Sequence, residues 1–498
     1  MRSKSYIRNI MIISILIAIS LASINVIADN ISESQFDKIS KETNKGILRQ
    51  NEVWVDDDYY DGGYNDGHTW GYDAFDNIQD GINNVSDDGI VHVYDGTYDV
   101  FKIEGRSNIQ VSAEGDVLVE GSQQVWDATV PAMANCMIFV NNSNGIDLSG
   151  FNIQGNGLSG RSYAVFYNSS TGEISYCTVS PNERGNMNSI GIRAQWNSNV
   201  VIEHCLVENY GRIAIYCRTG TILGIYNNTL IGPLYLDGEG DYVSYGIEVE
   251  DLEFASHATI RYNEIYNHDH TGTPTWSSSG IIVDAWRYYE VTSENCSAII
   301  EYNDIHDNMM GLQIVPNDNI HVNRNEIYDN TEYGAVSDPY WNGEAYVDYD
   351  LDALNNWWGD PSGPYHPDEN PEGLGDNITD NVIHAPWVET VLPKINLTKP
   401  LDWYLYISIG DFFELKIPCI TNLIIGKIDI EAETPNCLYE IDRVEFYIDD
   451  EHMSTDFTEP YSWLWDERQM FFLYTIKVVA YDSIGNSGYD DIQVWKLL

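Results

Sequence analysis

The segment Ile300-Glu301-Tyr302-Asn303-Asp304-Ile305 contains a pattern that recurs through the middle of the chain. An apolar residue is followed by two spacers, then Asn or Cys, one spacer and a second apolar residue. A looser first copy is Leu148–Ile153. The fourth position falls at residues 151, 177, 205, 228, 263, 303 and 325, with shortest steps of about 22 residues. A period of this size predicts a solenoid, in which each repeat buries its apolar face only against its neighbours.

The copies alternate apolar and polar residues, which is typical of a β-strand rather than a helix. Asn and Gly follow the copies closely, as at Asp307-Asn308, Gly311 and Asp329-Asn330. No long helical periodicity separates the strands, so successive coils are expected to stack in parallel. Asn at the same turn of each coil can then pass side-chain hydrogen bonds from coil to coil. The alternative is an antiparallel sandwich with coincidental repeats.

Both ends of the repeat region carry features that predict caps. Ala74–Ile82 has helical spacing and predicts a short amphipathic helix, before a first coil at Ile90–Tyr94. The segment Asn355–Pro364 contains Trp357 and Trp358, which offer apolar area to cover a last coil. We therefore expect a parallel β-helix with end caps over residues 53–388.

The repeat pattern ends before Pro393, and a different sequence pattern follows. Alternating strands are predicted at Arg443–Asp449, Pro460–Trp465 and Thr475–Asp482. Strands separated by turns over such a length predict a small antiparallel β-sandwich at residues 393–498. The chain is thus predicted to be all-β.

The N-terminus has the form of a secretory signal peptide. Arg2, Lys4 and Arg8 precede an apolar run that ends near Ala28. Residues 1–28 are predicted to be removed, and residues 29–52 to be a flexible segment. The alternative is an uncleaved N-terminal anchor. In either case we expect a secreted or cell-surface protein.

Charge restricts the partners. The chain has 77 acidic and 25 basic residues, for a net charge of −52. Phosphate would be repelled, so nucleic acid is not an expected partner, nor is lipid beyond an uncleaved anchor. Glycans and cell-envelope proteins remain. Eight Asn-X-Ser/Thr sequons offer glycosylation sites, at Asn30, Asn84, Asn141, Asn168, Asn227, Asn295, Asn377 and Asn396.

The seven cysteines do not form a disulfide framework. Cys177 and Cys205 share the ladder position of consecutive repeats, which favours stacked buried thiols. Cys419 and Cys437 lie in the C-terminal segment, and whether they are bridged is left open.

These segments resemble a known group. Val55–Asp58, Ile78–Ile82 and the closing Asn356–Gly359 are similar to the two ends of right-handed parallel β-helix surface proteins of the pectin-lyase-like kind, especially those of methanogenic archaea. Val444–Asp449 and Ala480–Asn486 resemble the bacterial-type Ig-like domain often fused to them. The resemblance implies a right-handed β-helix followed by an Ig-like sandwich. It says little about activity, because this fold hosts binders, lyases, hydrolases and structural stalks.

No catalytic residues are predicted. The paired-Asp and Gly-His motifs of polygalacturonase-like enzymes and the Arg pattern of pectate lyases are not evident. The Arg residues of the coils are few, namely Arg184, Arg193, Arg212, Arg218, Arg261, Arg287 and Arg324. We therefore expect a structural or adhesive surface protein that contacts glycans or neighbouring proteins. A polysaccharide lyase or glycoside hydrolase is the alternative class.

Two segments are candidates for metal binding, although no cofactor is certain. His268, Asp269 and His270 lie one coil before His306, and imidazole with carboxylate suits Zn²⁺ or Cu²⁺. A copper-binding accessory protein of nitrous oxide reductase shares the general fold, which makes a copper accessory role a further alternative. Asp56, Asp57 and Asp58 could hold Ca²⁺. Solvated turn residues are the competing interpretation of both.

Aromatic residues near the longest insertions are the candidates for ligand binding. Rings over a polar face can stack on sugars, whereas rings that pack against their own loops would only order the insertions. The residues are Trp276, Trp286, Tyr288, Tyr289 and Trp341.

Overall fold

The computed structural model describes residues 49–498 apart from 129–131, 156–159, 183–185, 187, 234–242, 251–253, 271–276, 284–295, 342–344, 390–392, 402–403, 410–412, 419–420, 435–440, 468–471, 484 and 498. Within this part of the chain, no helix has the length and apolar character needed to span a bilayer. The predicted signal peptide lies outside the described residues. Strand β1 (Gln50–Val55) begins inside the segment predicted to be flexible, so regular structure starts earlier than Val53.

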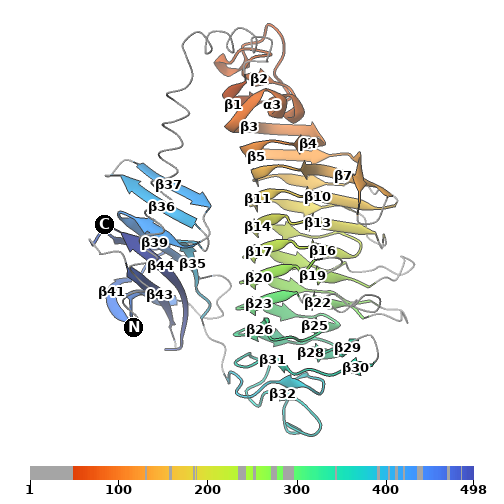
Figure 1. The fold of residues 1–498 in the computed structure, drawn as a ribbon, viewed down its shortest axis with the longest axis vertical. Coiled ribbons are helices and arrows are strands. Elements are labelled where there is room, and N and C mark those ends of the chain that lie inside the picture. Colours follow the sequence, from red (N-terminus) through yellow and green to blue (C-terminus); the bar gives the residue numbers. More distant parts are fainter. Residues whose placement is uncertain are drawn as a thin grey trace, which may run out of the picture. The chain divides into compact units, whose positions relative to one another are not determined.

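The repeat region is a stack of coils (Figure 1). Most coils have three short strands, whereas in the first coils the long strands β3 (Val85–Asp99) and β5 (Ser107–Glu120) take the place of the first two. In one three-stranded coil these are β23 (Ser297–Glu301), β24 (Asp304–His306) and β25 (Met310–Ile314). Each strand pairs in parallel with its counterpart one coil later, as in Ile300↔Val322 and Ile305↔Ile327. The apolar residues of each repeat therefore align from coil to coil, and the expected parallel β-helix is observed.

The first two strands of each coil form an 18-stranded sheet, here called sheet A. Its other strands are β1, β2 (Ala74–Phe75), β3 (Val85–Asp99), β5 (Ser107–Glu120), β8 (Asn144–Ser149), β9 (Asn152–Gln154), β11 (Thr171–Ser175), β12 (Thr178–Ser180), β14 (Asn199–Glu203), β15 (Leu206–Val207), β17 (Ile222–Tyr226), β18 (Thr229–Ile231), β20 (His257–Arg261), β21 (Glu264–Tyr266), β26 (Ile320–Asn323) and β27 (Glu326–Tyr328).

The third strand of each coil belongs to a second sheet, here called sheet B. It runs in the order β28-β25-β22-β19-β16-β13-β10-β7-β4, and β6 pairs antiparallel with β7. The other strands are β4 (Phe101–Glu104), β6 (Gln123–Asp127), β7 (Ala132–Asn141), β10 (Ser162–Asn168), β13 (Ser189–Gln195), β16 (Ile213–Arg218), β19 (Tyr245–Glu250), β22 (Ser279–Val283) and β28 (Tyr333–Ser337).

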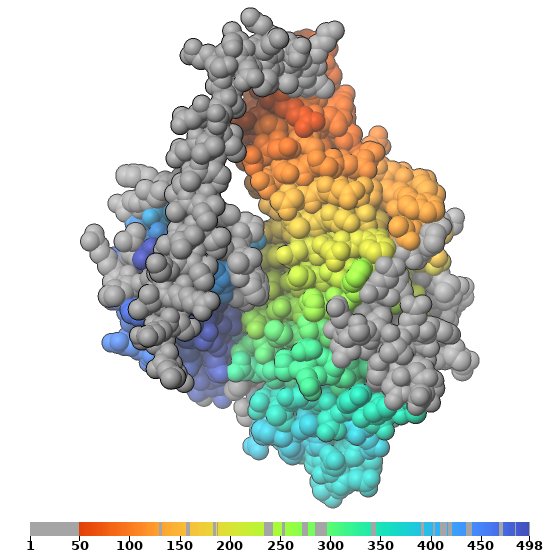
Figure 2. All heavy atoms as spheres, in the orientation of Figure 1, coloured from red at the N-terminus to blue at the C-terminus, as the bar shows by residue number. Residues whose placement is uncertain are grey.

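A continuous apolar core fills the coils. Its residues come from both sheets and lie in rows, such as Ile202, Ile225, Ile260 and Ile300 at 0% exposure. In the space-filling view, the coils from orange through yellow to green contact one another directly (Figure 2). Each coil thus buries its apolar face against its neighbours, as a solenoid requires.

A ladder of buried Asn side chains joins the coils at the turn within sheet A. The amide nitrogen of each residue donates to the amide oxygen of the next at 2.9–3.0 Å. The members are Asn228, Asn263, Asn303, Asn325 and Asn356, all at 0–1% exposure. The amide nitrogens also donate to core-strand carbonyls, as Asn303 does to Ile260 O at 2.8 Å. The predicted coil-to-coil hydrogen bonds are confirmed.

The residue before each ladder position has a left-handed backbone. Examples are Tyr262 (φ 61°), Tyr302 (φ 58°) and Arg324 (φ 58°). This conformation costs an ordinary residue about 1 kcal/mol. It makes the tight turn that directs the Asn side chain inward and the preceding side chain outward.

A second ladder lies at the turn before the third strand, where the sequence predicted turn residues at Asn308 and Asn330. Asn308 donates to Asn330 Oδ1 at 3.1 Å, and Asn330 donates to Asp376 Oδ2 at 2.8 Å. His268 occupies the same position one coil earlier and hydrogen-bonds Asn308 Oδ1 at 2.8 Å. Two ladders therefore fix the turns of one coil against those of the next.

Both ends of the core are covered by elements of the chain. Helix α3 (Ile78–Asn84) lies beside β1 and β2 at the first coil, and it buries Ile78 and Ile82 (Figure 1). The helix is shorter than predicted, because Ala74-Phe75 forms β2. At the other end, Trp358 is fully buried in the core. Trp357 is only half-buried, and its backbone forms an isolated parallel β-bridge with Glu326. Short strands lie on both sides of Trp358 in the chain, namely β29 (Tyr340–Trp341), β30 (Tyr346–Val347), β31 (Leu351–Asp352), β32 (Pro364–Tyr365), β33 (Gly375–Asn377) and β34 (Val382–Ile383). The 3₁₀ turn η1 (Asn65–Gly67) lies between β1 and β2.

The five cysteines that the structure describes are buried, and Cys136, Cys177, Cys205 and Cys217 are free thiols. Cys177 and Cys205 stack at the ladder position of consecutive coils. The backbone N–H of Cys205 donates to Asn228 Oδ1 at 2.9 Å, which connects the two thiols to the Asn ladder. The expected stacked thiols are therefore observed. Cys419 and Cys437 lie outside the described residues.

The C-terminal segment is a sandwich of two sheets. One is antiparallel and contains β35 (Asn396–Lys399), β39 (Ile428–Glu433) and β42 (Tyr461–Trp465). The other runs β37-β36-β38-β44-β43-β40-β41. Its strands are β36 (Tyr404–Ile409), β37 (Phe413–Pro418), β38 (Leu423–Ile425), β40 (Ile441–Ile448), β41 (Glu451–Asp456), β43 (Phe472–Asp482) and β44 (Ser487–Leu497). The sandwich has its own core around Phe446 and Trp465. Among the strands described for this segment, β38 alone departs from the predicted antiparallel pattern, because it pairs in parallel with β36 and β44.

Candidate functional site

The outward face of sheet B gathers buried polar and aromatic side chains. On β19, Ile247 and Val249 point into the apolar core, so Glu248 and Glu250 point outward. Strand register places residues of neighbouring coils in rows across this face. One row contains Phe139, Phe166, Arg193, Tyr216, Glu248, Ile282 and Gln313. The next contains Asn141, Asn168, Gln195, Arg218 and Glu250.

Arg193, on the interior strand β13, is held by several partners. Its guanidinium pairs with Asp127 at 3.1 Å and donates to Gln195 Oε1 at 2.7 and 2.9 Å. It also donates to Tyr163 Oη at 2.9 Å and lies 4.7 Å from the centroid of that ring. Asp127 and Arg193 are 0% and 2% exposed. A buried charge needs such partners, so Arg193 is fixed in position and charge-balanced.

Glu250 is the last residue of β19, where it is partly buried and held by two partners. Arg218 Nε lies 3.0 Å from Glu250 Oε2, and the Tyr216 hydroxyl donates a hydrogen bond to that carboxylate. The Arg218 guanidinium also lies over the Tyr216 ring, 5.7 Å from its centroid. Glu250 is therefore a paired carboxylate with a fixed orientation.

Glu248 has a different environment, although it is only two residues away. It is 2% exposed, and its Oε2 has no hydrogen-bond partner among the residues that the structure describes. Burial raises the pKa of Glu248 to about 7, against the lowering effect of Arg212. Glu250 raises that pKa further, and Arg218 and Arg193 lower it. An unpartnered buried carboxyl oxygen is costly, and in a native structure it points to a functional role.

Three of the few coil arginines therefore lie on this face. Arg193 and Arg218 belong to strands, and Arg212 precedes β16, with its guanidinium 5.7 Å from the centroid of the Tyr245 ring. Their carboxylate neighbours are Asp127, Glu248 and Glu250. The arrangement offers hydrogen-bond donors and acceptors between aromatic rings, and it includes one carboxyl that can be protonated near neutral pH. These groups can donate and accept hydrogen bonds, and a carboxyl with a pKa near neutral can transfer a proton.

The sequence did not identify Glu248 or Glu250. Both lie in a strand whose residues are nearly all buried, so it reads as an apolar stretch without the Asn motif. The one available signal was the presence of two glutamates, two residues apart, in a β-strand between apolar neighbours.

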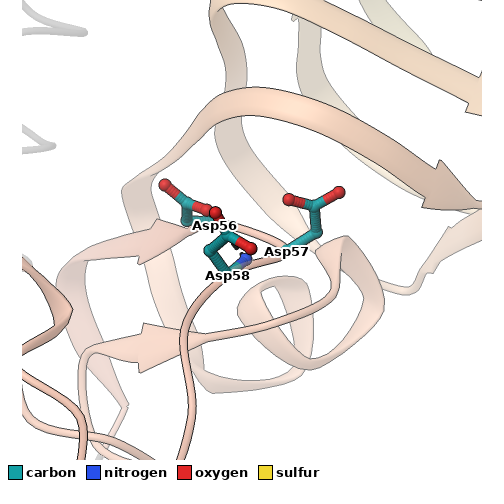
Figure 3. A group of neighbouring side chains, drawn as sticks. All are labelled: Asp56, Asp57 and Asp58. Atoms are coloured by element: carbon teal, nitrogen blue, oxygen red, sulfur yellow. Dashed lines mark hydrogen bonds between the residues drawn. The ribbon is translucent and has the colours of Figure 1, made fainter.

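The predicted Ca²⁺ residues are brought together. Asp56, Asp57 and Asp58 follow β1 on one loop, and one carboxylate oxygen of each lies within 4.8 Å of the others (Figure 3). Burial raises the pKa of Asp56, and the neighbouring acidic charges raise it further. Asp57 also accepts a hydrogen bond from Thr97 N at 3.0 Å, which joins the loop to the first coil. Calcium binding at this loop stays a prediction.

The predicted His cluster is not brought together. His268 is fully buried in the second ladder, where one ring nitrogen contacts Asn308 and the other contacts the Tyr210 hydroxyl at 2.5 Å. His270 hydrogen-bonds Ser278 at 2.9 Å, and Asp269 accepts a hydrogen bond from the backbone of His270. His306 lies in a separate row on sheet A. Among the described residues, only the three aspartates meet the distance requirement for a common ion.

His306 belongs to a ladder of stacked rings on the outward side of sheet A. Its ring lies 5.1 Å from that of Tyr266 and 5.0 Å from that of Tyr328, at angles of 7° and 12°. Burial lowers the pKa of His306, but hydrogen bonds to Glu264 and Asp307 raise it more, to about 9. Because these rings face one another, their faces are not available to a sugar ring.

The predicted sugar-stacking residues cannot be compared with this arrangement. Trp276, Trp286, Tyr288 and Tyr289 lie outside the described residues, and Trp341 is described only as part of β29. Their role stays a prediction.

The sequons occupy varied environments. Asn377 is exposed and Asn84 is half-buried, whereas Asn396 is buried. Asn141 and Asn168 are hydrogen-bonded neighbours on sheet B, at 2.8 Å, and Asn227 has a left-handed backbone before the ladder residue Asn228. Asn30 and Asn295 lie outside the described residues. Exposed Asn377 is therefore the most accessible of the described sequons.

Comparison with known families agrees with both domains. Residues 107–298 match the right-handed β-helix region, and residues 423–483 match the bacterial Ig domain. The chain is therefore all-β, with a right-handed parallel β-helix followed by an Ig-like domain. Both kinds of domain are typical of extracellular proteins, and together they indicate a surface or carbohydrate-related protein. A comparison with curated proteins finds no match to this chain.

Several solved structures are similar in part. Fibronectin(III)-like modules of Clostridium thermocellum CbhA share 21% identity with a TM-score of 0.17, covering 22% of this chain and 50% of theirs. ORF18 of Geobacillus virus E2 shares 11% identity with a TM-score of 0.37, covering 84% and 72%. A pectin methylesterase mutant in complex with a hexasaccharide shares 7% identity with a TM-score of 0.26, covering 75% and 87%. This chain spans half the length of the CbhA modules. At TM-scores this low, none of the three similarities indicates a function.

Proposed function

We propose that this protein is exported to the cell surface and binds neutral glycans at the outward face of sheet B. One observation carries the proposal: Glu248 is buried there with an unpartnered carboxyl oxygen, between rings and arginines. A ligand hydroxyl would supply the missing hydrogen bond. Contact with cell-envelope proteins, and an archaeal origin, remain predictions from the sequence.

Charge favours a neutral ligand over an acidic one. The chain carries a net charge of −52, which repels polyanions at long range. Within the face, Arg193 is balanced by Asp127 and Arg218 by Glu250. These guanidiniums are therefore already neutralised, and their remaining role is to orient the carboxylates and to donate hydrogen bonds.

The test is an array of neutral and acidic glycans probed with the purified protein, with and without EDTA. We expect selective binding of neutral oligosaccharides that survives EDTA and is weakened at least 10-fold by Tyr216→Ala. The matched control is Glu120→Gln, an exposed residue on sheet A that should leave binding unchanged. Binding that is lost in EDTA would move the site to the aspartate loop. A folded sample that binds no glycan would contradict the proposal and favour a purely structural role.

A further inference from the structure

We infer that the outward face of sheet A is the docking surface of the chain's own Ig-like domain, and that a buried lysine, Lys394, fixes the domain there. Two domains of one chain move relative to each other unless specific contacts hold them together. The β-helix and the Ig-like domain lie within one compact unit, Asn51–Leu498. The inference goes beyond the proposed function, which concerns sheet B alone.

One position of the repeat shows that part of sheet A is covered. The residue before the ladder position points outward, and three coils have tyrosine there. Tyr176 is 62% exposed, whereas Tyr262 and Tyr302 are only 4% and 8% exposed. The rings of Tyr262 and Tyr302 stack 5.1 Å apart, but this stack covers only one face of each ring. The same residue at the same repeat position therefore differs in exposure because another element lies over the later coils.

The covering element includes strand β44 of the Ig-like domain. The Tyr302 hydroxyl donates a hydrogen bond to Tyr489 O at 2.7 Å. The next residue, Asp490, is 7% exposed. Burial raises the pKa of Asp490, against the lowering effects of Arg261 on β20 and of a hydrogen bond from Tyr262. Side chains of sheet A thus surround two consecutive residues of β44.

Lys394 makes the contact with the most charge. It lies two residues before β35 and beside Ile395, which belongs to the core of the Ig-like domain. Its Nζ is 3.2 Å from Glu326 Oε1 and 3.4 Å from Asp304 Oδ2. Strand register places these two carboxylates next to each other on neighbouring coils of sheet A. Lys394 is 7% exposed, and a buried charge without partners is strongly destabilising, so the lysine and the two carboxylates depend on one another.

A third contact fixes the orientation of the domain. Glu433, the last residue of β39, accepts a hydrogen bond from Asn227 Nδ2 at 2.9 Å and lies 3.2 Å from His204 Nε2. Asn227 and His204 hold the same repeat position as the tyrosines. Three separate parts of the Ig-like domain therefore contact sheet A. One polar contact could act as a hinge, whereas three separated polar contacts define a single orientation.

The experiment is hydroxyl-radical footprinting of the full chain, read by mass spectrometry. The oxidation rate of a tyrosine ring follows its exposure, so Tyr176 serves as the internal standard. In the wild-type protein we expect Tyr302 to be oxidised about 8-fold more slowly than Tyr176, following their exposed fractions of 8% and 62%. Lys394→Glu places a third carboxylate beside Asp304 and Glu326, and it should bring the rate at Tyr302 close to that at Tyr176.

Two further variants separate docking from a general loss of folding. Lys399→Glu makes the same charge change on β35, but Lys399 pairs with Glu431 of its own domain at 3.5 Å, so Tyr302 should stay protected. Combining Lys394→Glu with Asp304→Lys exchanges the two charges and keeps their sum. This double variant should restore the protection of Tyr302. Circular dichroism checks that each variant remains folded.

Three results would overturn the inference. One is a wild-type protein in which Tyr302 is oxidised as fast as Tyr176. Another is a folded Lys394→Glu variant in which Tyr302 stays protected. The third is protection that disappears when the protein is diluted to a monomer, because the covering domain would then come from a second copy of the chain. Glycan binding on sheet B is independent of all three.

Discussion

The Asn ladder of sheet A and the outward face of sheet B both bury polar side chains, but they differ in how those side chains are satisfied. Asn303 has partners for its amide nitrogen and its oxygen, in its own coil and in the neighbouring ones. Glu248 is equally buried and leaves one oxygen without a partner among the described residues. A satisfied buried group stabilises the coil, whereas an unsatisfied one lowers stability and is available to a ligand.

Removing one ladder amide should have the largest effect. In Asn303→Ala, the backbone and side-chain nitrogens of Asn263 lose their shared acceptor, and Asn325 loses a donor. Each buried group left unpaired costs about 1–3 kcal/mol, so we expect the free energy of unfolding to fall by about 4 kcal/mol. Denaturant titration measures it. The control is Asn319→Ala, an exposed turn residue, and equal loss in both variants would contradict the ladder's role.

Removing the charge of Glu248 should raise the free energy of unfolding, whereas removing the ladder amide lowers it. Its pKa is raised from 4.5 to about 7 on folding, so the folded state disfavours the ionised form. The penalty is absent below pH 4.5, develops as the pH rises, and is complete above about 7, where it reaches about 3 kcal/mol. Glu248→Gln should therefore stabilise the protein at pH 8 and leave its stability at pH 4.5 nearly unchanged.

Glu250 provides the contrast within the same strand. Because Glu250→Gln removes the partner of Arg218, it should destabilise the protein at pH 8. The two variants are compared by denaturant titration at both pH values. If Glu248→Gln also destabilises at pH 8, the contrast between the paired and the unpaired carboxyl fails.

A smaller effect on stability is expected at His306. This residue lies between the satisfied Asn ladder and the unsatisfied Glu248, because it is partly exposed but well paired. Its pKa is raised from 6.5 to about 9. The stabilisation is fully present below pH 6.5 and is lost as the pH rises through about 9, and solvent screening limits it to about 1 kcal/mol. The difference in stability between wild type and His306→Gln should shrink over that range. Exposed His321→Gln is the matched control for the loss of a surface imidazole.

The smallest effect is expected where the ladder could be extended. Cys205 occupies the ladder position next to Asn228, whose side chain already accepts a hydrogen bond from the Cys205 backbone. In Cys205→Asn, the new amide nitrogen can donate to Asn228 as the other members do. We expect stabilisation of at most about 1 kcal/mol by thermal or denaturant unfolding. A clear loss of stability would show that the thiol is required by its surroundings.

The ladder was predictable because Asn recurs in the sequence once per coil, at the same position of the repeat. The spacing of Asn between apolar residues fixes both the turn and the inward direction, as in Ile300–Ile305. The sandwich strands around Phe446 were predictable for a similar reason, since their alternation shows which face is buried.

The outward face of sheet B was not predictable in the same way. Its strands are buried on both sides, so Tyr245–Glu250 shows no alternation that separates core from ligand face. The rows that join Arg193 to Glu248 also depend on insertions of unequal length between coils, and the sequence does not give their register. The second ladder was predicted at Asn308 and Asn330, but the role of His268 was not, because a histidine occupies the Asn position in that coil.

The direction of the inter-coil hydrogen bonds has a mechanical consequence. In sheet A, sheet B and both ladders, these bonds run from one coil to the next, along the direction in which the coils stack. A force that pulls neighbouring coils apart is therefore shared among all the bonds of that boundary instead of breaking them one at a time.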